Sequence, residues 1–225
     1  MSTLKHRLAV LHHRIHAAEL AAERPLNSVK LLAVSKTQPA TTILEAYCAG
    51  QRHFGENYLQ EALAKQVQLS AFDIDWHFIG PIQSNKTRAI AEHFSWVHSV
   101  DRLKIAERLS EQRPEYLPPL NICLQVNISQ EPSKSGIILD ALPEMVAAVQ
   151  SLRGICLRGV MAVPEPASDI VVQRIPFRQL FLAVKHLQHP ELDTFSMGMS
   201  DDLEAAIYEG STWVRVGTAV FGKRK

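Results

Sequence analysis

Residues 30–37 read Lys-Leu-Leu-Ala-Val-Ser-Lys-Thr, a short apolar run that ends in polar side chains. Residues 43–48 follow with helical periodicity. The same order of apolar run and helical segment recurs along the chain. It predicts strands at 30–34, 52–55, 75–79, 96–100, 122–126, 157–160, 194–196 and 213–216. Strands that alternate with helices form a parallel sheet.

About eight such units without a long linker favour a (β/α)8 TIM barrel over a Rossmann-like open sheet. No G-x-G-x-x-G sequence follows the first strand, which argues against the open sheet. We therefore expect residues 1–225 to form a single α/β barrel domain.

Helical spacing of apolar residues predicts an extra N-terminal helix that ends before Pro25. Its apolar stripe consists of Leu4, Leu8, Leu11, Ile15 and Ala22. Later helices are predicted at 56–67, 142–152 and 176–187, where Pro176 suits a first helical turn.

Charge and composition narrow the classes of function. The chain has 24 Lys and Arg against 23 Asp and Glu, a formal net charge of +1. No overall field therefore attracts nucleic acid or an anionic membrane, and the basic residues 223–225 are too few for a nucleic-acid patch. The three cysteines form no C-x-x-C pair, which indicates reduced thiols. Without a signal peptide or a bilayer-spanning apolar stretch, a cytoplasmic location is expected.

Lys36 closes the first strand, at the end where barrels of this kind place their chemistry. Alternation puts its side chain on the same face as Leu32 and Val34. If that face is the barrel interior, the amine lies at the mouth of an apolar pocket, where desolvation favours its neutral, nucleophilic form. Such a lysine can form a Schiff base. A solvated lysine at a strand end is the alternative, and position alone does not decide.

The last two strands lead to a predicted phosphate site. Ser200 is well placed as the N-cap of the next helix, and the final strand delivers Gly217 and Thr218. Loops after strands seven and eight are the usual phosphate site of this fold. Asp201 and Asp202 would repel a dianion unless they turn outward, so an ordinary capped helix remains the alternative.

Arg215 shares a strand face with Gly217 and is expected just below this loop. Its permanent positive charge needs a partner. A buried carboxylate is one candidate, and the unprotonated ring nitrogen of a heteroaromatic ligand is the other.

These residues belong to longer motifs, which together resemble the pyridoxal phosphate homeostasis protein family, the YggS-like proteins, over nearly the whole chain. The motifs lie at residues 33–37 (Ala-Val-Ser-Lys-Thr), 54–61 (Phe-Gly-Glu-Asn-Tyr-Leu-Gln-Glu), 76–80 (Trp-His-Phe-Ile-Gly), 83–86 (Gln-Ser-Asn-Lys), 133–136 (Ser-Lys-Ser-Gly), 196–202 (Ser-Met-Gly-Met-Ser-Asp-Asp) and 214–222 (Val-Arg-Val-Gly-Thr-Ala-Val-Phe-Gly).

The resemblance implies the barrel of alanine racemases, fold-type III, with pyridoxal 5′-phosphate (PLP) held as a Schiff base on Lys36. By the same resemblance, the phosphate would lie on Ser200, Gly217 and Thr218, and the pyridine nitrogen would face Arg215. The full set of cofactor-binding residues it implies is Lys36, Asn57, Ile79, Met161, Met199, Ser200, Arg215, Gly217 and Thr218.

The resemblance also implies a function without a dedicated catalytic residue. Such a protein binds, stores or delivers PLP as a carrier or regulator in PLP homeostasis, and its partners include PLP-dependent apo-enzymes that receive the cofactor. An arginine opposite the ring nitrogen disfavours the pyridinium form and weakens the electron sink of carbanion chemistry. A monomer is expected, because the dimerisation domain of the racemases has no counterpart.

Two enzymatic alternatives stay open. A PLP-dependent racemase needs an acid/base group on each face of a small amino acid, and alanine racemases take one of these from a C-terminal domain that this sequence is expected to lack. A Schiff-base aldolase would instead use Lys36 on a phosphorylated sugar. Lys134 stands where those racemases carry an arginine, and a surface-loop position is expected for it.

The histidines suggest no further site. His12 and His16 are spaced i,i+4 on the first helix, but they lack an acidic third ligand, so no metal is expected. His77 is expected to be a buried, hydrogen-bonded core residue rather than a general base.

Overall fold

The computed structural model describes residues 3–129, 131 and 134–222. Eight parallel strands close into one barrel in which each strand pairs with the next in sequence and β1 pairs with β8. The strands are β1 (Lys30–Val34), β2 (His53–Glu56), β3 (Asp75–Phe78), β4 (Trp96–Val100), β5 (Leu120–Val126), β6 (Ile155–Ala162), β7 (Thr194–Ser196) and β8 (Trp213–Val216). The predicted barrel is confirmed, and the open Rossmann-like sheet is excluded.

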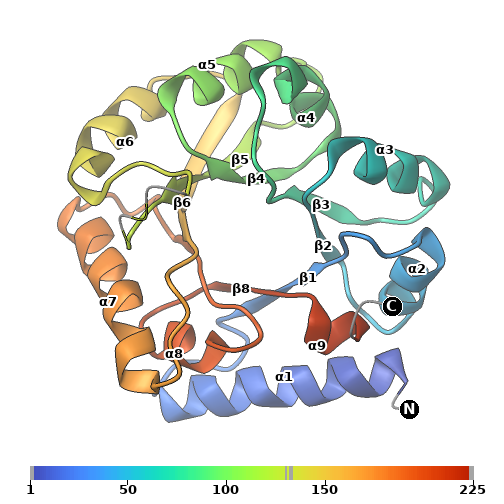
Figure 1. Cartoon of the computed structure of the whole chain (residues 1–225). Helices are drawn as coiled ribbons and strands as arrows, with labels where there is room; N and C mark the ends of the chain where they lie inside the picture. The colour runs from blue at the N-terminus through green and yellow to red at the C-terminus, as the bar shows by residue number, and fades with distance from the viewer. Residues whose placement is uncertain (1–2, 130, 132–133, 223–225) are drawn as a thin grey trace.

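Helices form an outer ring around these strands, as the view down the barrel shows (Figure 1). The longer ones are α1 (Leu4–Ala21), α2 (Ala40–Cys48), α3 (Leu59–Gln68), α4 (Thr87–His93), α5 (Leu103–Gln112), α6 (Leu142–Gln150) and α7 (Ile170–His186). The shorter ones are α8 (Leu203–Tyr208), α9 (Thr218–Phe221) and the 3₁₀ turns η1 (Ser84–Lys86) and η2 (Leu139–Ala141).

The predicted N-terminal helix is confirmed as α1, which lies along the outside of the barrel beside α8 and α9 (Figure 1). Thr3 caps it by accepting a hydrogen bond from the His6 amide at 3.2 Å. Its stripe of Leu4, Leu8, Leu11 and Ile15 is buried. Full burial of each such side chain stabilises the fold by about 1.5–3 kcal/mol, so apolar packing holds α1 against the C-terminal elements.

Three predicted helix starts are wrong. The helix expected at 56–67 begins at Leu59, because Glu56 still belongs to β2. The helix expected from Pro176 begins six residues earlier at Ile170, because the Asp169 carboxylate caps the amides of Val171 and Val172 at 2.7 and 3.2 Å. Pro176 therefore lies inside α7.

The third correction concerns Ser200, which does not cap a helix. Asp202 occupies the N-cap position of α8. The Asp202 carboxylate accepts a hydrogen bond from the Met199 amide at 2.6 Å, which folds residues 199–202 into a tight turn ahead of the helix. The turn leaves Ser200 at the mouth of the barrel rather than at a helix end.

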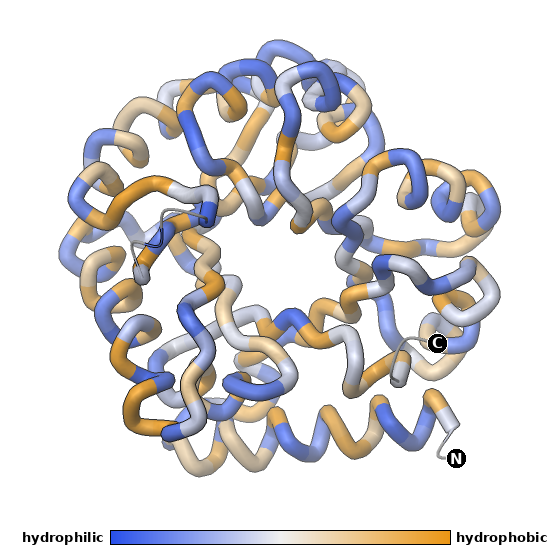
Figure 2. The backbone as a smooth tube through the Cα atoms, in the orientation of Figure 1, coloured by the Kyte–Doolittle hydropathy of each residue, from blue (hydrophilic) through white to orange (hydrophobic). Residues whose placement is uncertain are grey.

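The main apolar core fills the space between the sheet and the helices, and Figure 2 shows hydrophobic segments recurring on both. Within the described residues, no helix is both long and apolar enough to cross a membrane. All three cysteines are free thiols: Cys123 is buried, whereas Cys48 and Cys156 are exposed.

Candidate functional site

A cavity of about 700 Å³ opens at the C-terminal end of the barrel strands. This size suits a small organic ligand, and this end of the fold is where active sites lie. Every residue that the family resemblance implies for the cofactor lines this one cavity: Lys36, Asn57, Ile79, Met161, Met199, Ser200, Arg215, Gly217 and Thr218. Residues far apart in the chain are therefore brought together as predicted.

Lys36 reaches the cavity because β1 alternates as predicted. Leu32 is fully buried, and Val34 and Lys36 both line the cavity wall. The half-buried side chain of Lys36 therefore follows the inward face of the strand. Lys36 therefore lies at the mouth of the cavity and not on the outer surface of the barrel.

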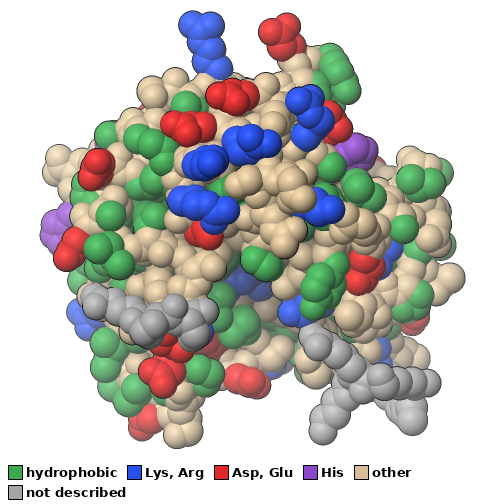
Figure 3. Space-filling model, turned by 45° about the horizontal axis from the view of Figure 1, so that its top comes forward, with side chains coloured by type: hydrophobic (Ala, Val, Ile, Leu, Met, Phe, Trp, Pro, Cys, Tyr) green, Lys and Arg blue, Asp and Glu red, His purple; other side chains and the backbone are tan. Residues whose placement is uncertain are grey.

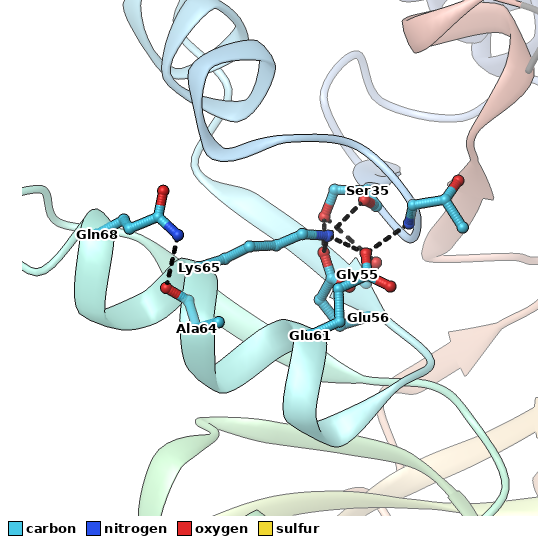
Figure 4. Close-up of polar contacts among 8 residues, drawn as sticks. Ser35, Gly55, Glu56, Glu61, Ala64, Lys65 and Gln68 are labelled. Carbon is cyan, nitrogen blue, oxygen red and sulfur yellow. Dashed lines mark hydrogen bonds and ion pairs between the residues drawn. The ribbon is translucent and has the colours of Figure 1, made fainter. Parts of the chain in front are cut away.

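The peptide groups on both sides of Lys36 are held by charged side chains of α3 (Figure 4). The Lys65 ammonium donates to the Ser35 carbonyl oxygen at 2.9 Å, and the Glu61 carboxylate accepts from the Thr37 amide at 2.6 Å. Lys65 also pairs with Glu61 at 2.5 Å and with the fully buried Glu56 at 2.8 Å. Sequence reasoning missed this cluster, although the i,i+4 spacing of Glu61 and Lys65 was a usable signal.

Arg215 is 5% exposed and forms part of the cavity wall. Its guanidinium donates to the Ser196 carbonyl and hydroxyl oxygens and, at 2.9 Å, to the Ala162 carbonyl oxygen. Among the described residues, no carboxylate lies within ion-pair distance of it, so the buried-carboxylate alternative finds no direct partner. Burial lowers the pKa of Arg215 to about 10, while the charge of Asp202 opposes this shift.

A chain of hydrogen-bonded histidines runs through the barrel interior to Arg215. His53 Nδ1 lies 3.2 Å from His77 Nε2, His77 Nδ1 lies 2.9 Å from His98 Nε2, and His98 Nδ1 lies 2.7 Å from the Ser196 hydroxyl. Because arginine can only donate, the hydroxyl that accepts from Arg215 is set to donate to His98. The prediction that His77 is a satisfied core residue is confirmed, but the chain itself was missed.

Burial keeps this chain neutral. The pKa of His98 falls to about 3, chiefly because burial disfavours the charged ring, with a further contribution from Arg215. Burial also lowers the pKa of His77 well below its usual value, and the neighbouring His98 and His53 add to the shift. Burial therefore disfavours the charged forms of both His77 and His98 beneath Arg215.

The predicted phosphate end of the cavity is formed by Ser200, Gly217 and Thr218. A side chain at Gly217 would put its Cβ 3.2 Å from the Val34 carbonyl oxygen, so glycine lets the loop approach β1 closely. Asp201 is exposed, and Asp202 is engaged with the Met199 amide. Burial raises the pKa of Asp202 against the effect of that hydrogen bond.

Arg14 of α1 is a cavity residue that sequence reasoning missed. Its guanidinium donates to both carboxylate oxygens of Glu204 at 2.8 and 2.9 Å and to the Ser200 carbonyl oxygen at 3.1 Å. Only the fold could reveal this contact, because Arg14 and Ser200 are 186 residues apart in the chain.

The other side of the cavity is lined by Asn57, Ile79 and Met161. Glycine allows close packing here, because a Cβ on Gly80 would lie 2.1 Å from the Asn57 carbonyl oxygen. The buried Oδ1 of Asn57 has no hydrogen-bond partner within the described part of the chain. Its amide therefore keeps hydrogen-bonding capacity for a ligand.

Lys134 lies beside a smaller cavity of about 230 Å³ that shares Ile79, Met161 and Val163 with the main one. Its ammonium pairs with Glu131 at 2.5 Å and lies 3.3 Å from the Val163 carbonyl oxygen. The lysine is thus engaged both with its own loop and with the loop that follows β6. Ser133, part of the same motif, lies outside the described residues.

A second cavity, of about 780 Å³, lies beside the N-terminal ends of β7 and β8 and contains none of the predicted site residues. Over the described ranges, no group of three or more His, Cys, Asp or Glu side chains is arranged to hold a metal ion. On the surface, acidic and basic side chains are interspersed, although Lys and Arg gather in the upper part of the view in Figure 3. The cavity around Lys36 is therefore the candidate site.

The fold and this site define a class of protein. Residues 7–225 match the family model of the alanine racemase N-terminal domain. The closed barrel of parallel strands agrees with this match. The chain belongs to the pyridoxal phosphate homeostasis protein family.

The relatives support this assignment over nearly their full lengths. The chain is 60% identical over 224 residues to the pyridoxal phosphate homeostasis protein of Pseudomonas aeruginosa, covering 100% of this chain and 97% of the relative. It is 52% identical over 229 residues to the protein of that name from Escherichia coli, covering 100% and 98%. The structure of PipY from Synechococcus elongatus with PLP bound is 40% identical, with a TM-score of 0.84 and coverage of 98% and 100%.

Proposed function

We propose that this protein holds pyridoxal 5′-phosphate as a Schiff base on Lys36 and acts in intracellular PLP homeostasis as a carrier or regulator. The observation that carries the proposal is the convergence of Lys36, Arg215 and the Ser200, Gly217 and Thr218 loops on one cavity. These groups supply an amine for the aldehyde, a cation for the ring and a cradle for the phosphate.

The cavity residues fit such a cofactor. Within the described part of the chain, the bonds of Arg215 use three of the five N–H donors of a guanidinium, so donors remain for a ring nitrogen. The unpartnered Oδ1 of Asn57 supports a polar substituent near the ring. Ile79 and Met161 offer apolar surface for the ring itself.

Little or no catalytic turnover is proposed. PLP supplies an electron sink when its ring nitrogen is protonated. Arg215 is fixed by Ser196 and Ala162 and has no proton to give near neutral pH, because its pKa stays at about 10. A fixed cation facing the nitrogen keeps the ring unprotonated and the sink weak. The names of the relatives support a homeostatic role for them rather than a catalytic one.

The proposal also covers the location, oligomeric state and partners of the protein. We place it in the cytoplasm, as one monomeric domain that exchanges PLP with apo-enzymes. The helix α7 exposes apolar side chains, among them Val171, Val172 and Ile175. Exposed apolar patches can mark an interface between protein chains, so the oligomeric state should be measured. Light scattering is expected to give a mass near 25.2 kDa, and twice that mass would contradict the monomer.

Spectroscopic titration with PLP tests the role of Lys36. The wild-type protein is expected to develop the violet absorption band of a lysine Schiff base, and Lys36→Ala is expected to lose it. Lys30→Ala is the matched control, because Lys30 lies at the other end of the same strand and is exposed. A band that persists in Lys36→Ala would overturn the proposal.

Chiral analysis separates the carrier from the racemase. Single enantiomers of small amino acids are incubated with the PLP-loaded protein, and their optical purity is followed. The carrier leaves them unchanged over many minutes. Steady racemisation on the order of 1 s⁻¹ or faster would identify an enzyme.

A further inference from the structure

The conformation of the chain at Lys36 is unusual on its C-terminal side. Thr37 has φ of +65°, in the left-handed region that β-branched residues rarely adopt. Such a backbone conformation is unfavourable in conformational free energy, so contacts with the surrounding structure must stabilise it. The hydrogen bond from the Thr37 amide to Glu61 at 2.6 Å is placed to do so.

The N-terminal side of Lys36 is held by the same cluster. The carbonyl oxygen of Ser35 accepts from Lys65 at 2.9 Å, and the Ser35 hydroxyl donates to Glu56 at 2.6 Å. Ser35, Glu56 and Lys65 are all at most 5% exposed. Hydrogen bonds among charged groups shielded from water are stronger than neutral ones. The peptide groups before and after Lys36 are therefore both fixed by buried or half-buried charges.

Glu61 and Lys65 are joined to each other and project from one face of α3 toward β1 (Figure 4). The ion pair makes the two contacts interdependent, because Glu61 orients Lys65 and Lys65 screens Glu61 from Glu56. Glu56 anchors the pair from the end of β2. The linked pair of Glu61 and Lys65 therefore hydrogen-bonds the peptide groups on both sides of Lys36.

We propose that Glu61 and Lys65 are positioning residues that clamp the backbone of Lys36 and thereby aim its amine into the cavity. The proposal rests on the proposed function, since it assigns the aim of a lysine that carries the cofactor. Neither residue lines the cavity. They act through the backbone of residues 35–37.

Variants of Glu61 test the clamp most cleanly. Glu61→Ala removes the acceptor for the Thr37 amide, whereas Glu61→Gln keeps an oxygen acceptor at the same length. Gln68→Ala is the control, because Gln68 lies on the same helix and, among the residues that the structure describes, donates only to the Ala64 carbonyl oxygen of that helix (Figure 4). Lys65→Met would strand buried Glu56 without its cation and risks misfolding, so it is a secondary variant.

Two readouts are combined for each variant. The first is PLP affinity, measured by titration of the absorption band. The second needs no cofactor: brief acetylation of the apo-protein with acetic anhydride, followed by peptide mass spectrometry of Lys36. Thermal unfolding of the apo-proteins shows whether any change merely follows lost stability.

Glu61→Ala is expected to lower PLP affinity about tenfold, the loss corresponding to one charge-assisted hydrogen bond, and to raise Lys36 acetylation. Glu61→Gln is expected to retain most of the affinity. Adding Thr37→Gly to Glu61→Ala is expected to restore part of it, because glycine adopts this φ without steric strain. Gln68→Ala is expected to behave as wild type.

Wild-type affinity and acetylation in Glu61→Ala would overturn the clamp, as would a Thr37→Gly addition that restores nothing. A failure of the proposed function would give a different result from a failure of the clamp. In that case the wild-type protein itself forms no band with PLP, while the acetylation of Lys36 still reports whether Glu61 positions the amine.

Discussion

At the scale of single residues, the site combines one reactive amine with one permanent cation, and each is held by a separate polar network. The charged cluster on α3 hydrogen-bonds the peptide groups on both sides of Lys36. Arg215 donates to the Ser196 hydroxyl, which connects it to the histidine chain. The histidine chain occupies positions that would be apolar in an ordinary barrel interior, whereas the other network lies between the sheet and α3. Their buried ionisable groups should make the stability of the protein depend on pH.

Stability is expected to fall steeply with acid because of His98. Its pKa is about 3 in the folded protein against an ordinary value of 6.5, so the unfolded chain binds a proton there that the native protein does not. The native state is therefore destabilised as pH falls below about 6.5, by about 1.4 kcal/mol per pH unit for each such histidine. His77 acts in the same direction.

His98→Gln is expected to flatten this dependence. Glutamine has both a donor and an acceptor for the neighbours of His98 but does not titrate. Urea unfolding at about pH 7 and about pH 5.5 should show a slope of stability with pH that is smaller in the variant by about 0.8 kcal/mol per unit, because the unfolded histidine is only partly protonated over much of this interval. Equal slopes in the two proteins would show that His98 already takes up its proton in the folded state.

At the scale of elements, α1 connects the N-terminus to the proposed phosphate end of the site. Its buried stripe packs outside the barrel, and Arg14 reaches across to Glu204 and to the Ser200 carbonyl oxygen. The helix thus braces the loop after β7 and contributes a side chain to the cavity.

Arg14→Met is expected to weaken PLP binding about three- to tenfold, because partly exposed ionic contacts contribute modestly. Pyridoxal, which lacks the phosphate, should be affected less. His13→Ala is the control, since His13 is the exposed neighbour on the same helix. Equal losses for PLP and pyridoxal would place the effect of Arg14 away from the phosphate.

Elements also show what sequence can and cannot predict. The positions of Lys36 and Arg215 followed from alternation along single strands, and the Ser200 and Gly217 loops from their place after the last two strands. The start of α3 at Leu59 was missed because β2 extends to Glu56. The start of α7 at Ile170 was missed because capping by Asp169 outweighed the apolar pattern. The contacts between Lys65 and Ser35 and among His53, His77 and His98 depend on how neighbouring units register in the closed barrel, which no local pattern records.

At the scale of the whole molecule, the barrel brings both ends of the chain to one site. The loop directly after β1 supplies Lys36 and β8 supplies Arg215, and both line one cavity because β1 pairs with β8. Closure of the sheet is therefore a condition for the site. Because the charge of the chain is nearly balanced, at +1, the proposed binding of phosphate falls to this local cradle rather than to an overall field.

The most direct test of the account is to locate the bound cofactor chemically. The PLP-loaded protein is reduced with borohydride, digested and analysed by peptide mass spectrometry. We predict a pyridoxyl phosphate mass on the peptide that contains Lys36, at close to one per chain. Label spread over surface lysines, with the Lys36 peptide unmodified, would contradict the account.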